Sequence, residues 1–323
     1  MAKLAPKPKS APIKAPPQEA GSSKVKAVAT VAVEVEGVRT SDDLLAERGM
    51  YTCHAPPGHG KTFFALTGSV YCPKDLSKKT TPTAKVLDAV WMACDRGATA
   101  GFKERGVLAP YIVDLNYIMR PPLKNEKKPY ADNILDALPL MIDLAYQVFE
   151  QAGTIKWIVV DTVSSIDRQL NAYWEDHVPT SKAGKEDRFA MYRMIGKYHS
   201  QFYDAMSLFP CNVMFLAHTK AQIESDDTTQ QLKQRAAASA GDNELTPSIT
   251  GKSLETYTAN VDVEFALEAL QEPGWKPGDP AAFKRYVYPI GGKKMRGKNR
   301  FQLSLGTKEP ADLGLIMARI RGG

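Results

Sequence analysis

The chain has 323 residues, 43% of them apolar, and its 42 basic and 36 acidic side chains give a net charge of +6. This length allows one large or two small domains, with core enough to fold without disulfides or a metal. The composition excludes a collagen, a wholly disordered chain and a small disulfide scaffold.

No apolar run approaches the roughly 18 residues of a membrane-spanning helix, and the N-terminus lacks the apolar stretch of a secretory signal. We therefore expect a cytoplasmic protein without membrane contact. The cysteines are scattered and form no Cys-x-x-Cys pair, which argues against a metal or redox motif. We expect reduced, buried thiols at Cys53, Cys72, Cys94 and Cys211.

Residues 1–38 are predicted to form a disordered basic tail rich in Pro, Ala and Lys. Within 1–30, six lysines stand against one glutamate, so six minus one gives +5 of the total +6. With so few large hydrophobic residues the tail cannot bury enough surface to offset its ordering entropy. Three uses stay open: loose contact with nucleic acid through phosphate neutralisation, docking of a protein partner, or a solubilising leader.

Beyond the tail, apolar runs alternate with helical periods. Strands are predicted at 50–55, 89–94, 111–115, 157–160 and 213–217. Helices are predicted at 63–70, 134–149 and 189–208. This alternation implies parallel crossovers, and the nearly continuous apolar strands fit a sheet covered on both faces. We therefore expect an α/β domain over 39–310, with a mostly parallel, doubly wound sheet and helices on both faces.

The C-terminal part of the domain has a different pattern. Residues 221–253 are polar and lack a usable period, which is typical of a mobile loop. Strand patterns return at 261–265, 285–290 and 299–305, and we expect the last two to form a basic β-hairpin over 284–305. Residues 311–323 are predicted to be a C-terminal tail.

Residues 55–62, Ala-Pro-Pro-Gly-His-Gly-Lys-Thr, match the phosphate-binding motif G-x-x-x-x-G-K-[ST] except that Ala55 replaces the first Gly. Glycines allow positive φ and close approach to phosphates, and backbone N–H groups at the start of the next helix form an anion nest. We expect Lys61 to reach the β- and γ-phosphates and Thr62 to ligate Mg²⁺. The residues expected to bind ATP are Pro57, Gly58, His59, Gly60, Lys61, Thr62 and Phe63.

Two carboxylates follow apolar strands. Asp161 ends the run 157–160 and is expected to be the second Mg²⁺ ligand, the alternative being a helix cap. Asp95 ends the run 89–94 and is expected to orient the attacking water, the alternative being a surface turn residue. The chain lacks the N-K-x-D signature of GTPases, and Thr162 stands where AAA+ and DEAD-type motors place Glu.

Together, the loop 55–62, Asp95, the segment 159–165 and the segment 212–220 resemble the RecA-like ATPase core, and most closely its phage-encoded branch, which includes single-strand annealing ATPases. The resemblance covers about residues 45–305. It implies a RecA-like sheet, ATP hydrolysis with Mg²⁺, and homo-oligomeric assembly on single-stranded DNA, in the host cytoplasm if phage-encoded.

The resemblance also implies that His218, at a strand tip, senses the γ-phosphate. The residues alone leave a helix cap or a packed core histidine as alternatives. The chain departs from the family pattern at Ala55 and at Asp95, which is one methylene shorter than the usual Glu, so we expect slow hydrolysis.

Two segments are candidate DNA surfaces, and they differ in charge. The loop 221–253 has three basic against five acidic residues and no aromatic residue, which makes it a poor phosphate clamp. The span 284–300 has seven basic residues and no acidic one. The resemblance implies that this hairpin reaches ATP on a neighbouring protomer, with Lys294 and Arg296 as candidates. Binding of a DNA backbone or a solvated surface are the alternatives for Lys293, Lys294, Arg296, Lys298 and Arg300.

The sequence therefore predicts an ATP-hydrolysing RecA-like protein that acts on DNA in phage recombination, single-strand annealing or replication. One alternative is a hexameric helicase-type motor. Another is an assembly scaffold gated by ATP without catalysis. A small-molecule kinase is disfavoured because no Arg-rich lid is recognisable near the phosphate loop.

Overall fold

A computed structural model describes residues 48–69, 84–85, 88–95, 97–98, 107–108, 111–219, 247–250, 253–271, 283–289, 298–300 and 308–321. The predicted tail 1–38, most of the loop 221–253, and Lys293, Lys294 and Arg296 lie outside these residues. All described residues belong to one unit, Thr40–Gly323.

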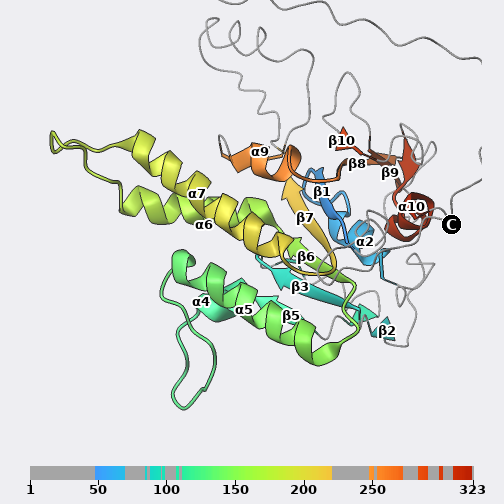
Figure 1. Ribbon diagram of the computed structural model, residues 1–323, viewed down its shortest axis with the longest axis horizontal. Coiled ribbons are helices and arrows are strands. Elements are labelled where there is room, and N and C mark those ends of the chain that lie inside the picture. The colour runs from blue at the N-terminus through green and yellow to red at the C-terminus, as the bar shows by residue number, and fades with distance from the viewer. Residues whose placement is uncertain are drawn as a thin grey trace, which may run out of the picture. The chain divides into compact units, whose positions relative to one another are not determined.

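One sheet organises the described residues, with strand order β11-β9-β8-β1-β7-β6-β3-β5 and β10 beside β8 (Figure 1). Every pairing from β8 to β5 is parallel, whereas β9, β10 and β11 pair antiparallel. The strands of this sheet are β1 (Met50–Ala55), β3 (Ala89–Ala93), β5 (Ile112–Asp114), β6 (Trp157–Asp161), β7 (Asn212–His218), β8 (Val263–Gln271), β9 (Phe283–Tyr288), β10 (Lys298–Asn299) and β11 (Glu309–Pro310). Two short strands, β2 (Ala84–Lys85) and β4 (Val107–Leu108), form a separate parallel pair.

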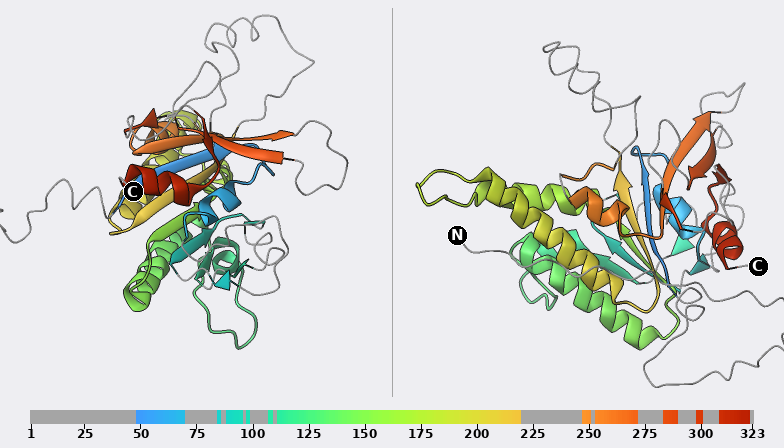
Figure 2. Two further views of the ribbon diagram at one scale, coloured as in Figure 1. Left: turned by 90° about the vertical axis from the view of Figure 1, so that its right-hand side faces the viewer. Right: turned by 45° about the horizontal axis from the view of Figure 1, so that its top comes forward.

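Helices cover both faces of the sheet (Figure 2). One face carries α4 (Leu115–Met119), α5 (Ile134–Ala152), α6 (Val163–Asp176), α7 (Arg188–Ser207) and α9 (Ser253–Thr258). The other carries α2 (Lys61–Leu66) and α10 (Leu313–Ile320). The predicted α/β class, with a mostly parallel sheet between helical layers, is confirmed.

Alternation along the central strands divides the core between the two layers. In β6, Ile158 and Val160 belong to the cluster under α5, α6 and α7, whereas Trp157 and Val159 belong to the cluster under α2 and α10. This follows from the two-residue period of a strand. A strand buried on both faces therefore reads as one continuous apolar run, which is the pattern the sequence shows.

Polar caps fix the ends of the long helices. The Asn133 side chain accepts from two backbone N–H groups at the start of α5, and Gly153, with φ of 64°, ends that helix. Thr162 caps α6 and Asp187 caps α7. Helix α6 is absent from the predicted elements, although its cap follows directly on Asp161.

The C-terminal strands pair differently from the prediction. The antiparallel hairpin consists of β8 and β9, which pair from Ala266 to Gln271. The sequence predicts that 299–305 pairs with 285–290. In the described part of this segment, Asn299 of β10 pairs instead with Val263 of β8, so the predicted pairing is wrong there. The physical reason is the length of β8. Its nine residues are long enough for β10 and β9 to pair with different parts of the strand.

Residues 313–320 form α10 where the sequence predicts a tail. The Asp312 side chain caps this helix, and the backbone N–H of Leu313 donates to the Thr67 hydroxyl at 2.8 Å. The side chains of Leu313, Ile316 and Met317 are buried in the core cluster that α10 shares with α2. The C-terminal helix therefore supports the segment that follows the phosphate loop.

Cys53, Cys94 and Cys211 are buried and free, as predicted, and Cys72 lies outside the described residues. Burial raises the pKa of Cys53 and of Cys211 to about 12. Within the described part of the chain, every helix is too short or too polar to cross a membrane.

The packing of α10 predicts a large difference between two neighbouring truncations. The Ile316 side chain is only 2% exposed, so Ile316→Ala should leave a cavity in the core. The free energy of unfolding should therefore fall by about 2 to 5 kcal/mol. Leu315→Ala is the matched control, because Leu315 is 55% exposed and should cost little. Chemical denaturation measures both, and equal small effects would show that α10 does not stabilise the domain.

Candidate nucleotide-binding site

The loop between β1 and α2 has the backbone that phosphate binding requires. Gly58 and Gly60 have φ of 81° and 97°, which side chains other than glycine rarely tolerate. A Cβ on Gly60 would lie 2.6 Å from Arg285 Nε, so a side chain there would displace Arg285. Ala55, in contrast, is a buried residue of β1, and its carbonyl oxygen accepts from Lys61. The departure from the usual first Gly therefore places a small side chain in the core.

The Lys61 ammonium folds back over the loop. Its Nζ donates to the carbonyl oxygens of Ala55 and Pro56, at 3.0 and 3.2 Å, and lies 3.2 Å from His218 Nδ1. Burial lowers the pKa of Lys61, and the charges of Asp161 and Asp95 oppose this. A phosphate in the cleft would add negative charge to that of Asp161 and Asp95 around this buried cation.

Asp161 ends β6 and contacts the start of α2. Its Oδ2 accepts from the Thr62 hydroxyl at 2.8 Å and from Trp91 Nε1 at 3.4 Å. Burial raises the pKa of Asp161 to about 6, against those hydrogen bonds and the charge of Lys61. The helix-cap alternative does not hold, because Thr162 caps α6 through its own hydroxyl, which accepts from the Ser165 N–H.

His218 ends β7 and lies between a cation and a carboxylate. Its Nδ1 faces Lys61, its Nε2 lies 3.4 Å from Asp95 Oδ2, and its backbone N–H donates to the Ser164 hydroxyl at 2.9 Å. The side chains of His218 and Asp95 both line the cleft, so neither is a packed core residue. Burial and Lys61 lower the pKa of His218, whereas Asp95 opposes the shift.

Arg285 is a site residue that the sequence indicates only as one member of a basic run. Strand β9 brings it over the loop, where its Nε donates to the His59 carbonyl oxygen at 3.0 Å and its side chain lines the cleft. Lys298 and Arg300 lie elsewhere, bound to the Ala259 carbonyl and to Asp262 respectively. A role for them at a neighbouring protomer or on DNA stays a prediction.

These segments enclose one cleft of about 370 Å³ at the carboxyl edge of the parallel strands. The register pairs Ala55 with His218 and Ala93 with Asp161, so four strands end side by side. Open parallel sheets bind ligands at this edge. Of the predicted ATP-binding residues, all but His59 have side chains or backbone lining the cleft, and His59 holds Arg285 over it.

The donors in this cleft fit a Mg²⁺–nucleotide complex. Thr62 and Asp161 present a hydroxyl and a carboxylate at adjacent positions, and Mg²⁺ prefers oxygen ligands of this kind. Within the described ranges, His, Cys, Asp and Glu nowhere gather in groups of three or more able to hold a metal by themselves. A magnesium ion here would take its other ligands from phosphates and water, as nucleotide enzymes commonly arrange.

The parallel sheet and the phosphate loop at its edge define a P-loop ATPase domain. Comparison with protein families matches residues 104–301 to the AAA domain family, and because this is more than half of the chain, the protein belongs to that family. The matched span includes Asp161, His218 and Arg285 and begins after the phosphate loop.

Among solved structures, a similar chain is the KaiC-like protein PH0186 from the hyperthermophilic archaeon Pyrococcus horikoshii OT3. The two are 13% identical, the similarity covers 79% of this chain and 83% of that chain, and the TM-score is 0.37. No curated protein matches the sequence.

The surroundings of His218 predict its titration. Its pKa should lie below the ordinary 6.5, so folding stability should rise with pH between the folded-state pKa and 6.5. Lys61→Met should raise this pKa and Asp95→Asn should lower it further. NMR titration of the imidazole measures all three, with Lys197→Met on the exposed side of α7 as the control. A His218 pKa at or above 6.5 would contradict the described packing.

Proposed function

We propose that this protein is a Mg²⁺-dependent ATPase that acts on DNA in recombination, single-strand annealing or replication, with slow or DNA-stimulated hydrolysis. The observation that carries the catalytic half is the convergence of Lys61, the Thr62–Asp161 pair and the Asp95–His218 pair on one cleft. This set supplies a phosphate-binding cation, oxygen ligands for magnesium and a carboxylate for water.

Each residue has a distinct task in this proposal. Thr62 and Asp161 hold Mg²⁺, which when bound neutralises charge on the phosphate oxygens. Lys61 pairs with the β- and γ-phosphates. Asp95 orients the attacking water and accepts its proton.

The contacts of Lys61 support a sensor role for His218. In the structure, the Lys61 ammonium contacts two carbonyl oxygens and His218 Nδ1. A γ-phosphate competes for the same ammonium and so removes a donor from His218 Nδ1. The histidine then keeps Asp95 as its partner, at the carboxylate that orients water.

The DNA half of the proposal is supported by charge. Residues 1–30 carry a net +5, and seven basic residues stand between 284 and 300 without an acidic one. We further propose that the chain assembles as a homo-oligomer. In such an assembly Lys293, Lys294, Arg296, Lys298 and Arg300 are available to a neighbour's nucleotide or to DNA, whereas Arg285 faces the nucleotide of its own chain.

Removing the ammonium tests the phosphate loop. Lys61→Ala should lower ATP turnover by about 100-fold or more, because Lys61 is the cation closest to the phosphates in this proposal. Phosphate release with and without single-stranded DNA, at several salt concentrations, measures it. Lys197→Ala should leave turnover unchanged. Normal turnover by a folded Lys61→Ala protein would exclude the proposed loop function.

Removing the carboxylate separates binding from chemistry. Asp95→Ala should retain ATP binding and lose turnover by roughly 100-fold, because the water loses its orienting base. Asp143→Ala, an exposed change on α5, is the control. Full activity of Asp95→Ala would assign the base to another residue. Tight ATP binding without turnover in the unaltered protein would instead favour an ATP-gated scaffold.

A further inference from the structure

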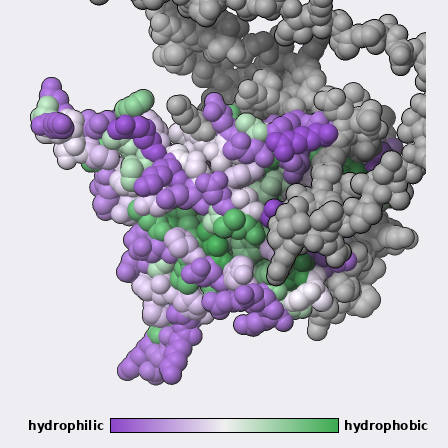
Figure 3. Space-filling model, in the orientation of Figure 1, coloured by the Kyte–Doolittle hydropathy of each residue, from purple (hydrophilic) through white to green (hydrophobic). Residues whose placement is uncertain are grey.

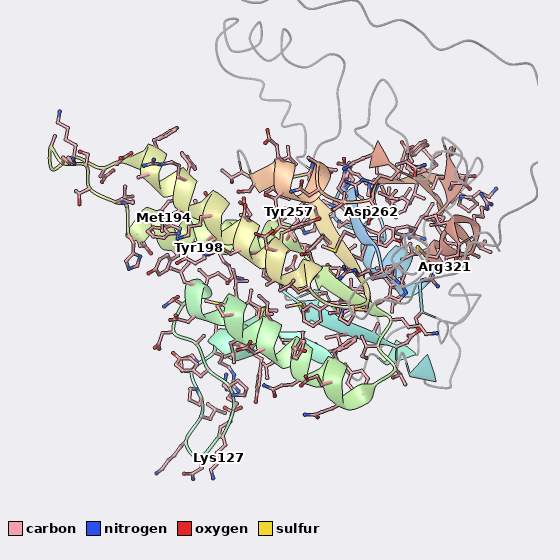
Figure 4. The ribbon with its side chains drawn as sticks, in the orientation of Figure 1. Lys127, Met194, Tyr198, Tyr257, Asp262 and Arg321 are labelled. Carbon is pink, nitrogen blue, oxygen red and sulfur yellow. The ribbon has the colours of Figure 1, made fainter. Side chains whose placement is uncertain are left out.

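A second basic surface lies at residues 117–130, hereafter called the basic loop, which comprise the end of α4 and most of the segment between α4 and α5. It protrudes from the body of the domain below α4 in Figure 1, and its surface is hydrophilic in Figure 3. Figure 4 places Lys127 at its tip. The loop is well separated in sequence from both the tail and the span 284–300.

The basic loop concentrates positive charge. It contains four basic residues and one acidic residue, so four minus one gives +3 within a chain whose total is +6. Lys124 and Lys127 are exposed. Glu126, the acidic member, is occupied within the loop: its carboxylate accepts from Arg120 Nη2 at 2.7 Å and from the Leu123 N–H at 2.8 Å. It therefore balances Arg120 and leaves the tip lysines to solvent.

Internal contacts preorganise this loop. The Tyr117 hydroxyl also donates to Glu126, at 3.0 Å. Lys128 donates to the carbonyl oxygens of Tyr117 and Arg120, and its Nζ lies 4.3 Å from the centre of the Tyr117 ring. A loop held in this way loses little conformational entropy when it binds a ligand.

Aromatic and apolar groups accompany the exposed lysines. Tyr117 is 43% exposed, Tyr130 is 38% exposed and Leu123 is 66% exposed. Cations that face phosphates beside rings that face bases form the usual surface for single-stranded nucleic acid. An acidic protein partner would contact the lysines but would offer no base to stack on the exposed rings.

The strand that precedes the basic loop ends at the edge of the sheet where the nucleotide cleft lies. Asp114, at the end of β5, is the register partner of Ala93, which stands two residues before Asp95. The chain then continues through α4 into the loop. A ligand on the basic loop therefore binds the segment that follows β5, and β5 is the neighbour of β3, the strand that precedes Asp95.

We propose that the basic loop is a binding surface for single-stranded nucleic acid, with Lys124 and Lys127 contacting phosphates and the Tyr130 ring stacking on a base. This inference rests on the proposed function, because it assigns a surface to the DNA that the ATPase is proposed to act on. Duplex nucleic acid should bind more weakly, because its bases are not available for stacking.

The test measures the affinity of the full-length protein for a fluorescent oligothymidine strand over a range of salt concentrations. Lys124→Glu combined with Lys127→Glu should weaken binding by on the order of tenfold and reduce the salt slope by about 1.4, at about 0.7 per phosphate contact. Tyr130→Ala should weaken binding roughly fivefold or more, and Tyr130→Phe should restore it. ATP turnover without DNA should not change in any of these proteins.

The matched control is Lys156→Glu combined with Lys197→Glu, which makes the same charge change at exposed sites before β6 and on α7. Equal affinities of the loop and control variants would overturn the assignment of the surface and leave the proposed ATPase function intact. A fluorescent polyglutamate peptide tests the other partner class: if the loop variant loses affinity for that peptide alone, the nucleic-acid assignment is wrong. If the unaltered protein hydrolyses ATP but binds no oligothymidine, the DNA half of the proposed function fails, and this inference with it.

Discussion

The hydrogen bond between Thr62 and Asp161 is the contact on which the site depends. At 2.8 Å it joins the first turn of α2 to the end of β6, two segments that stand 99 residues apart in sequence. Asp161 is 3% exposed, and an unpaired carboxylate at that depth would be strongly disfavoured. Thr62 and Trp91 therefore stabilise a buried charge that a divalent cation would compensate more fully. Asp161 is therefore a buried carboxylate at a position where an apolar side chain would be less costly to bury.

The parallel sheet explains why such distant residues meet. Strands β1, β7, β6 and β3 are neighbours in one register, so the residues that end them reach the same edge. A slip of one residue in any of these pairings would turn the terminal side chain to the opposite face. Both faces of the sheet are packed by large apolar side chains, which makes such a slip costly. The accuracy of the site is therefore a consequence of the double-sided core.

Local signals in the sequence explain what could be predicted. The strands at 50–55 and 157–160, the helix at 134–149 and the loop glycines depend on neighbouring residues, and each is present in the structure. The pairing of β10 with β8, the docking of α10 on α2 and the position of Arg285 over the loop depend on residues far apart in sequence. Arg285 stands among six other basic residues between 284 and 300, so composition alone could not single it out. The β8–β9 hairpin distinguishes it, because strand β9 brings the Arg285 Nε to the His59 carbonyl oxygen.

The same edge of the sheet connects the cleft to the segment that follows β7. Thr219 and Pro247 form an antiparallel bridge, and the Ser248 N–H donates to the His218 carbonyl oxygen at 2.5 Å. The described residues on either side of the segment 220–246 therefore pair with each other beside His218. From there, Thr250 donates to Asp167 of α6, whose other carboxylate oxygen lies 3.0 Å from the buried His199 of α7. Because α6 starts at the residue after Thr162, these hydrogen bonds connect the end of β7 to α6 and, through Asp167, to α7.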